Sequence, residues 1–203
     1  MVEVRISDLA HEFEDRTVFQ SLNFAFDGDC LAVTGPNGSG KSTLLRILAG
    51  LLTPTGGRAS FVINGDEVSR ESLRGVVGLA APDVRLYSEL TPRENLTFLA
   101  RARLCQADVE AALNEAGLLA RADDPVAELS SGLKQRAALA AALLHRPLVL
   151  MLDEPSSNLD ESGREMVRRV IDSRRSEGMV ILATNDPDEA LLGAARLDLG
   201  AAG

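Results

Sequence analysis

Cysteine and long hydrophobic runs are scarce in this sequence. Its 203 residues include only 2 cysteines, and these lack the Cys-x-x-Cys spacing and the histidine clusters of metal or redox sites. We therefore expect a reduced, cytosolic chain. No apolar run approaches the roughly 20 residues that cross a bilayer, and residues 1–8 alternate like a strand rather than forming a signal peptide. If the protein works at a membrane, a partner must supply the membrane-spanning part.

Net positive charge is also missing. Lysine and arginine number 21 against 30 acidic residues, which gives a formal net charge of -9. This balance opposes broad contact with nucleic-acid phosphates or with an anionic lipid surface. The short basic clusters fall in helix-like stretches, where a solvated helix face explains them. The sequence therefore predicts no nucleic-acid partner.

Short strand patterns are abundant instead. Residues 2–6 alternate apolar and charged side chains, and the segments around 24–26 and 61–63 end in turns, which predicts an antiparallel sheet. By contrast, residues 30–34, 76–80, 148–152 and 179–184 are nearly continuous apolar runs, typical of parallel strands buried on both faces. Helical patterns separate these runs. The alternation indicates an α/β core, and the length allows one well-buried domain with room for an inserted subdomain.

Helical patterns dominate residues 82–146. Thr91 is a predicted N-cap followed by a proline, with Glu94 placed as in a capping box. Asp108 is predicted to cap a second helix that ends near Gly117, and a third helix is expected from about Leu133 to about residue 145. We expect a single domain in which residues 1–81 and 147–203 form the α/β core and residues 82–146 form a helical subdomain.

A phosphate-binding loop joins the strand at residues 30–34 to a helical segment. The motif G-x-x-x-x-G-K-[ST] needs this strand-loop-helix context, in which backbone N–H groups and a helix N-terminus converge on phosphate oxygens. Lys41 is expected to reach the β- and γ-phosphates of ATP, and the Ser42 hydroxyl to ligate Mg²⁺. The predicted ATP-binding loop consists of Gly35, Pro36, Asn37, Gly38, Ser39, Gly40, Lys41, Ser42 and Thr43.

Two carboxylates follow the buried strand at residues 148–152. Ligands of parallel sheets bind at the carboxyl ends of the strands, where this strand delivers Asp153 and Glu154. Asp153 is therefore predicted to hold hydrated Mg²⁺, and Glu154 to face the attacking water as a general base. An acidic pair at a strand end is usually a solvated turn, but the phosphate loop on a neighbouring strand favours the catalytic interpretation.

Residues 129–136 carry the sequence Leu-Ser-Ser-Gly-Leu-Lys-Gln-Arg, which resembles the L-S-G-G-Q-x-x-R signature of ABC ATPases. The segment Glu-Pro-Ser-Ser-Asn-Leu-Asp at 154–160 is similar to the family's D-loop, with Asp160 as its aspartate. Phe13 falls where the family has an adenine-stacking aromatic. Alone, Phe13 would more often be a core or edge aromatic, and residues 130–132 an ordinary helix cap.

This resemblance covers nearly the whole chain and implies a P-loop NTPase fold: a RecA-like parallel-sheet core, an antiparallel β subdomain and an inserted α-helical subdomain. In the family, signature residues bind the γ-phosphate of ATP on a second protomer, which here implies Ser130, Ser131 and Gly132. The resemblance further implies an ATPase that drives transport, expected as a homodimer and located at the inner face of the cell membrane through permease subunits. A soluble ABC-type ATPase in DNA repair or on ribosomes, and a slow ATP-gated clamp, remain alternatives.

Three departures from the family pattern affect the predicted site. At the signature, Ser131 replaces a glycine and Leu133 a glutamine, which keeps a helix N-terminus. Pro82 occupies the position of the Q-loop glutamine and has no side-chain ligand, so we hypothesise that Asp83 or a water completes the metal shell. Asn185 replaces the switch histidine. It can position the γ-phosphate but cannot carry a proton, and we expect slower hydrolysis than in histidine-bearing relatives. Pairing with a more typical subunit would supply mixed sites.

Overall fold

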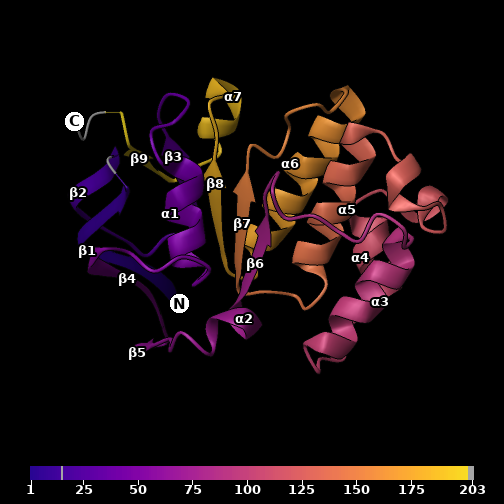
Figure 1. The fold of residues 1–203 in the computed structure, drawn as a ribbon, viewed down its shortest axis with the longest axis horizontal. Coiled ribbons are helices and arrows are strands. Elements are labelled where there is room, and N and C mark those ends of the chain that lie inside the picture. Colours follow the sequence, from indigo (N-terminus) through magenta and orange to yellow (C-terminus); the bar gives the residue numbers. More distant parts are fainter. Residues whose placement is uncertain (15, 201–203) are drawn as a thin grey trace.

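The computed structural model of the protein describes residues 1–14 and 16–200. Two β-sheets and a group of helices make up the fold (Figure 1). The strands are β1 (Val2–Phe13), β2 (Arg16–Phe26), β3 (Cys30–Thr34), β4 (Gly56–Ile63), β5 (Asp66–Glu67), β6 (Val77–Ala80), β7 (Val149–Asp153), β8 (Met179–Ala183) and β9 (Ala195–Asp198). The helices are α1 (Lys41–Leu48), α2 (Leu73–Val76), α3 (Pro92–Ala102), α4 (Val109–Glu115), α5 (Ser131–Leu143), α6 (Glu161–Arg175) and α7 (Pro187–Ala190), with 3-10 turns at Leu119–Arg121 and Val126–Glu128.

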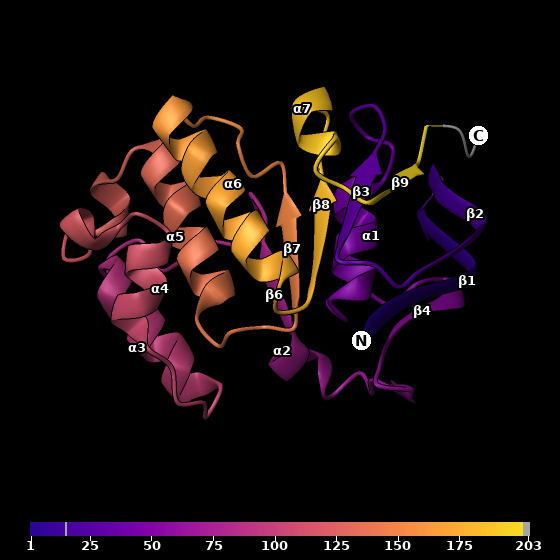
Figure 2. The same cartoon turned by 180° about the vertical axis from the view of Figure 1, so that it is seen from behind.

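The central sheet is parallel and has the strand order β6-β7-β8-β3-β9. The residues of β3, β7 and β8 are all buried, and their side chains alternate between two cores. In β7, Leu150 and Leu152 join the core with α5 and α6, whereas Val149 and Met151 join the core with α1 and the antiparallel sheet. Both faces of this sheet are covered (Figures 1 and 2), which confirms the buried strands predicted at residues 30–34 and 179–184 and most of the one at 148–152. Leu148 lies outside β7 and is 42% exposed, and the edge strand β6 is fully buried only at Val77 and Gly78.

The second sheet is antiparallel, with the order β2-β1-β4-β5. It confirms the predicted antiparallel sheet, but β1 runs on to Phe13, well past the alternating residues 2–6. The reason is irregular pairing: the register with β2 shifts between Ile6 and Leu9, and Asp8 has a φ of 45°. A bulge of this kind interrupts the alternation that sequence analysis relies on. The extension brings Phe13 towards the phosphate loop.

Helices fill residues 82–146, on the side of the parallel sheet away from the antiparallel sheet (Figure 2). Thr91 and Glu94 form the predicted capping box at α3, and Asp108 caps α4. Helix α5 begins at Ser131 rather than near Leu133, because the Ser130 hydroxyl accepts the Leu133 N–H at 3.3 Å and is the N-cap. The C-terminal half of α5 packs on the parallel sheet. A boundary at 82 and 146 stays a prediction, since α5 shares one core both with the parallel strands β7 and β8 and with the helix α4.

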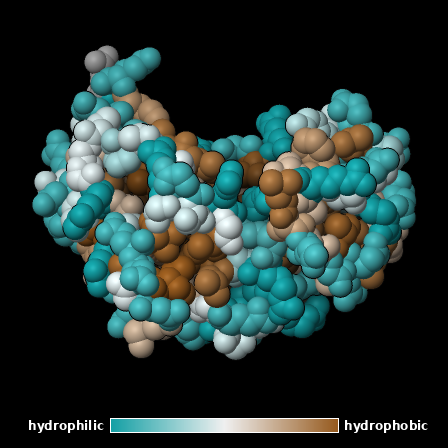
Figure 3. Space-filling model, turned by 90° about the horizontal axis from the view of Figure 1, so that it is seen from below, coloured by the Kyte–Doolittle hydropathy of each residue, from teal (hydrophilic) through white to brown (hydrophobic). Residues whose placement is uncertain are grey.

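The surface of the described part of the chain is largely hydrophilic, with apolar patches between the charged side chains (Figure 3). Large hydrophobic side chains that reach solvent include Leu51, Tyr87, Phe98 and Leu104. Within residues 1–14 and 16–200, no helix has the length and apolar character that a membrane span requires. Exposed apolar patches of this kind are typical of contact surfaces for other proteins.

Candidate nucleotide-binding and catalytic site

The candidate site lies at the carboxyl ends of three neighbouring parallel strands. Strand β3 leads into the phosphate loop, β7 ends at Asp153, and Asn185 follows shortly after β8. Since β7, β8 and β3 are adjacent in the sheet, these segments meet at one edge. The phosphate loop, Asp153 and Glu154 border a cleft of about 250 Å³, whose wall also includes Phe13. Asn185 contacts this site through its hydrogen bond with Lys41. The structure thus brings together residues that are far apart in the sequence, such as Asn37 and Asn185, which are 148 positions apart.

Lys41 is the first residue of α1, and its ammonium group turns back over the phosphate loop. The Nζ atom donates hydrogen bonds to the Gly35 carbonyl at 2.9 Å, the Pro36 carbonyl at 3.4 Å and the Asn185 Oδ1 atom at 2.7 Å. Only 6% of its side chain is exposed. A buried ammonium needs such partners, and the same N–H groups are suited to phosphate oxygens.

Gly40 allows the loop to turn into α1. It has a φ of 99°, a left-handed conformation that favours glycine, and a Cβ atom would lie 2.6 Å from the Val18 side chain. A larger residue would therefore strain the backbone and collide with β2. The helix that follows directs its N-terminal N–H groups at the loop, as an anion site requires.

Asp153 and Ser42 form the candidate Mg²⁺ ligands. Burial raises the pKa of the Asp153 carboxyl, while a hydrogen bond from the Ser42 hydroxyl opposes this shift. Across the described residues no cluster of His, Cys, Asp and Glu side chains could enclose a metal ion by itself. Two hard oxygen ligands at a phosphate site suit Mg²⁺, which usually keeps waters and takes further oxygens from the substrate. The residues present therefore fit a nucleotide-bound magnesium ion.

Glu154 and Asn185 lie beside Lys41. The Glu154 Oε1 atom is 3.7 Å from Lys41 Nζ, and the Asn185 N–H donates to Glu154 Oε2 at 3.5 Å. The side-chain amide of Asn185 also donates to Asn37 Oδ1 at 2.5 Å. Asn185 therefore joins the phosphate loop to the Glu154 carboxylate. Burial raises the pKa of Glu154, and the Asn185 N–H and the Lys41 charge oppose this rise.

Asp83 takes a different partner from the one hypothesised. Its carboxylate forms an ion pair with Arg46 at 2.9 Å, with 53% of the Asp83 side chain exposed. Its negative charge also raises the pKa of Asp153, so the two carboxylates are near each other. Service as a metal ligand would require the pair with Arg46 to open, and the role of Asp83 stays a hypothesis.

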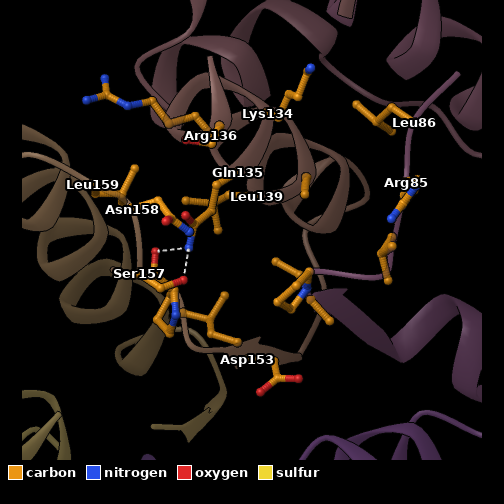
Figure 4. A pocket seen from close by; sticks show the side chains of 18 of the residues that line it. Arg85, Leu86, Lys134, Gln135, Arg136, Leu139, Asp153, Ser157, Asn158 and Leu159 are labelled. Carbon is orange, nitrogen blue, oxygen red and sulfur yellow. Dashed lines mark hydrogen bonds between the residues drawn. The ribbon is translucent and has the colours of Figure 1, made fainter. Parts of the chain in front are cut away.

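The signature and D-loop residues do not border the nucleotide cleft. Ser131 instead lines a larger cleft of about 440 Å³ between α5 and the end of β7 (Figure 4). Asp160 is the N-cap of α6 and accepts the Gly163 N–H at 2.9 Å, which lowers the pKa of its carboxyl. Ser130 and Gly132 begin α5, where they present a helix N-terminus outward.

Sequence analysis overlooked Arg16 and Val18, which border the nucleotide cleft with Phe13. Arg16 donates from its guanidinium to the Gly38 carbonyl at 2.6 Å, so it braces the phosphate loop from β2. No motif marks either residue. A strand pattern predicts a strand at Val18, but only the pairing of β2 with β1 brings Arg16 and Val18 next to the phosphate loop.

The fold and the site define a P-loop NTPase with a parallel-sheet core and a helical insertion. Solved structures agree: the dimeric structure of MJ0796, described as a bacterial ABC transporter cassette, superposes with a TM-score of 0.84, at 22% identity, and the match covers 97% of this chain and 95% of that one. The family model described as "ABC transporter" matches residues 19–157. The chain therefore belongs to the ABC transporter family.

Curated relatives place it among the ATP-binding subunits of that family. The lantibiotic transport ATP-binding protein SrtF of Streptococcus pyogenes is 34% identical over 184 residues, which are 90% of this chain and 79% of the relative. The cytochrome c biogenesis ATP-binding export protein CcmA 1 of Salmonella typhimurium is 39% identical over 192 residues, 92% of this chain and 90% of the relative. The chain is an ATP-binding, ATP-hydrolysing subunit of the ABC transporter family.

Proposed function

We propose that this chain hydrolyses Mg²⁺-bound ATP in the cleft formed by β3, β7 and β8, with Glu154 as the general base. The observation that supports this role is the position of the Glu154 carboxylate, 3.7 Å from the Lys41 ammonium and 30% exposed. Partial burial raises its pKa, which increases its basicity towards a water proton. Positive charge on Lys41 keeps the carboxylate ionised, as a base must be.

The remaining residues of the site are proposed to bind the substrate. We propose that the N–H groups of residues 35–43 and Lys41 hold the phosphates, that Phe13 stacks on adenine, and that Arg16 adds a positive charge at the rim. Ser42 and Asp153 would hold the magnesium ion, which when bound neutralises charge on the phosphate oxygens. Asn185 would donate to the γ-phosphate. Since asparagine stays neutral, we propose slower turnover than with a histidine there.

A second copy of the chain would complete the site. We propose that Ser130, Ser131 and Gly132 bind the γ-phosphate held by the other protomer, and that Asp160 lies at the same interface. The position of these residues outside the chain's own cleft supports a head-to-tail homodimer. A dimeric neighbour in fold supports it too. Mg²⁺·ATP would close this dimer, and hydrolysis would open it.

We propose that membrane-spanning permease subunits receive this motion, which would place the chain on the inner face of the cell membrane. Tyr87 and Phe98 are 57% and 46% exposed, and their rings pack edge to face with centroids 5.4 Å apart. An exposed aromatic pair is rare in a chain with 3% aromatic residues and suits a protein contact. They lie in residues 82–146, so a partner bound there would sense movement of the helical part. The relatives serve different processes, lantibiotic transport and cytochrome c biogenesis.

Phosphate release by the purified protein tests the assigned base. Glu154→Gln should lower the turnover number by about 100-fold or more, while the dissociation constant of a non-hydrolysable ATP analogue stays within about twofold. Glu165→Gln, at an exposed position of α6, is the matched control and should retain full activity. Unchanged phosphate release in Glu154→Gln would show that the base is misassigned. Wild-type protein that dimerises on ATP without releasing phosphate would instead be an ATP-gated clamp.

A further inference from the structure

Glu154 has a backbone conformation that its own side chain does not favour. Its φ is 49°, in the left-handed region, which is unfavourable for a residue other than glycine. Such a conformation persists when the surrounding contacts over-determine it. Here the Glu154 N–H donates to the Ala183 carbonyl at 2.8 Å, which ties the residue to the end of β8.

The Glu154 carbonyl accepts from three donors. The Ser157 N–H lies at 3.1 Å and the Ser157 hydroxyl at 2.8 Å, and both belong to the turn after β7. The third donor comes from a different part of the chain, the side-chain amide of Gln135 at 2.9 Å. That amide also donates to the Pro155 carbonyl at 2.6 Å and lies 3.5 Å from the Ser157 hydroxyl. Figure 4 shows Gln135 directed at this turn.

Gln135 belongs to α5, the helix that begins at the signature residues. Ser130 is its N-cap, and Gln135 lies between one and two turns further along. A single rigid helix therefore carries the proposed contact to the second protomer's nucleotide at one end. More than one turn later, Gln135 of the same helix donates a hydrogen bond to the backbone carbonyl of Glu154, the proposed base.

Polar contacts join α5 to this turn, in addition to the apolar core that includes Leu159 and residues of α6. The cleft of about 440 Å³ lies next to Gln135, between α5, Asp153 and the turn at Ser157–Asn158. Side chains do not fill that space, so within it directed hydrogen bonds hold the turn against α5. Besides those of Gln135, the Arg136 guanidinium donates to Asp160 at 3.4 Å.

We infer that Gln135 is a positioning residue, which holds the Glu154–Pro155 turn and makes the orientation of the Glu154 carboxylate depend on the position of the signature helix. Its amide hydrogens satisfy two successive carbonyls of the turn, and loss of both leaves the Glu154 backbone with its bonds to Ser157 and Ala183. When Ser130 and Gly132 bind the nucleotide of a second protomer, a shift of α5 then changes the orientation of Glu154 through Gln135. This inference rests on the proposed role of Glu154.

Gln135→Met tests the inference, because methionine keeps the length of the side chain and removes both donors. The turnover number should fall about tenfold, with the KM for ATP and the dissociation constant of an ATP analogue within about twofold of wild type. Gln106→Met, at an exposed position in the helical part, makes the same chemical change elsewhere and should leave activity unchanged. Ser157→Ala removes a second donor to the same carbonyl and should lower turnover in the same direction, which provides a test if Gln135→Met fails to fold.

A double-mutant cycle separates positioning from general stabilisation. In single-turnover experiments, Gln135→Met should have no further effect when Glu154 is already glutamine, because the base it positions is gone. An equal fall of rate in both backgrounds, or full activity of Gln135→Met, would overturn the inference. Full activity of Glu154→Gln by itself would instead overturn the proposed base, so the two failures are distinguishable.

Discussion

Cys30 and Cys105 differ in environment although both are free thiols. Cys30 opens β3 and is fully buried, and burial raises the pKa of its thiol to about 11. Cys105 follows α3 and is partly exposed. Since the thiolate is the reactive form, the fold rather than the residue type decides which cysteine reacts.

We predict that a thiol reagent at about pH 8 modifies one cysteine per native chain and two in denaturant. The physical reason is that Cys30 is both inaccessible and protonated, whereas Cys105 is reachable. An aromatic disulfide reagent releases one coloured thiolate for each cysteine that it modifies, so the absorbance gives the number of modified cysteines per chain. Cys105→Ser should abolish the native reaction, and rapid modification of two thiols in the native state would contradict the burial of Cys30.

His145 makes the stability of the fold sensitive to mild acid. Burial, and then the Arg103 charge, lower the pKa of this imidazole to about 4, although a bond to the Val77 carbonyl at 3.1 Å opposes the shift. In the unfolded chain the pKa is about 6.5. Between these values the unfolded chain binds a proton that the folded one does not, so the free energy of unfolding falls as the pH drops through about 6.5 towards 4.

We therefore predict that lowering the pH from neutral to about 5 decreases the free energy of unfolding by on the order of 1–2 kcal/mol, because His145 is protonated in the unfolded chain. Urea unfolding of wild type and His145→Gln at about pH 7.5 and about pH 5 measures this loss. The variant should lose less stability than the wild type over the same interval. Equal losses would show that His145 titrates alike in both states.

At the scale of elements, Arg174 joins α6 to α4. Its guanidinium donates to both carboxylate oxygens of Glu115, at 3.0 and 2.5 Å, and to Glu177 at 2.9 Å. Only 7% of the Arg174 side chain is exposed. Removal of one partner from a buried pair leaves the other charge without compensation. The contact ties the helical part of the chain to the helix that covers the parallel sheet.

We predict that Arg174→Met lowers the free energy of unfolding by about 3 kcal/mol, measured by urea titration. Arg175→Met is the matched control, because the neighbouring Arg175 pairs with Asp29 at 3.1 Å but both side chains are more exposed. That pair should contribute less than about 1 kcal/mol. Similar losses in the two variants would mean that burial does not distinguish the two pairs.

At the scale of the whole molecule, the signature residues do not border the chain's own nucleotide cleft, which supports the proposal that two chains form a complete site. We predict that Glu154→Gln forms a dimer in Mg²⁺·ATP and a monomer without nucleotide, as measured by light scattering after size exclusion. Slow hydrolysis should let ATP hold the interface together. Ser131→Glu in the same background should prevent dimerisation, because it places a negative charge where the γ-phosphate is expected.

Ala111→Glu is the matched control for this experiment. It adds the same charge to the first turn of α4, at an exposed position, and acidic residues near a helix N-terminus do not weaken the helix. A dimer that persists in Ser131→Glu, or that forms equally without nucleotide, would contradict the proposed arrangement.

The sequence by itself determined the fold class and the strands of the core, because buried parallel strands, helix caps and the phosphate-loop motif are local patterns. It also placed Lys41 at the start of the helix after the phosphate loop, and Asp153 and Asn185 at strand ends, and the structure brings the three to one edge of the sheet. Local patterns have limits: the bulge near Asp8 hid the full length of β1, and the N-cap at Ser130 moved the start of α5.

Only the tertiary structure decided which side chains touch. Arg16 reaches the phosphate loop through strand pairing, Asp83 pairs with Arg46, and Gln135 bonds to the backbone of Glu154 across 19 positions. Each contact joins segments that no shared motif connects. The geometry of these contacts depends on how the sheets and helices pack against one another, and the periodicity of the sequence does not predict that packing.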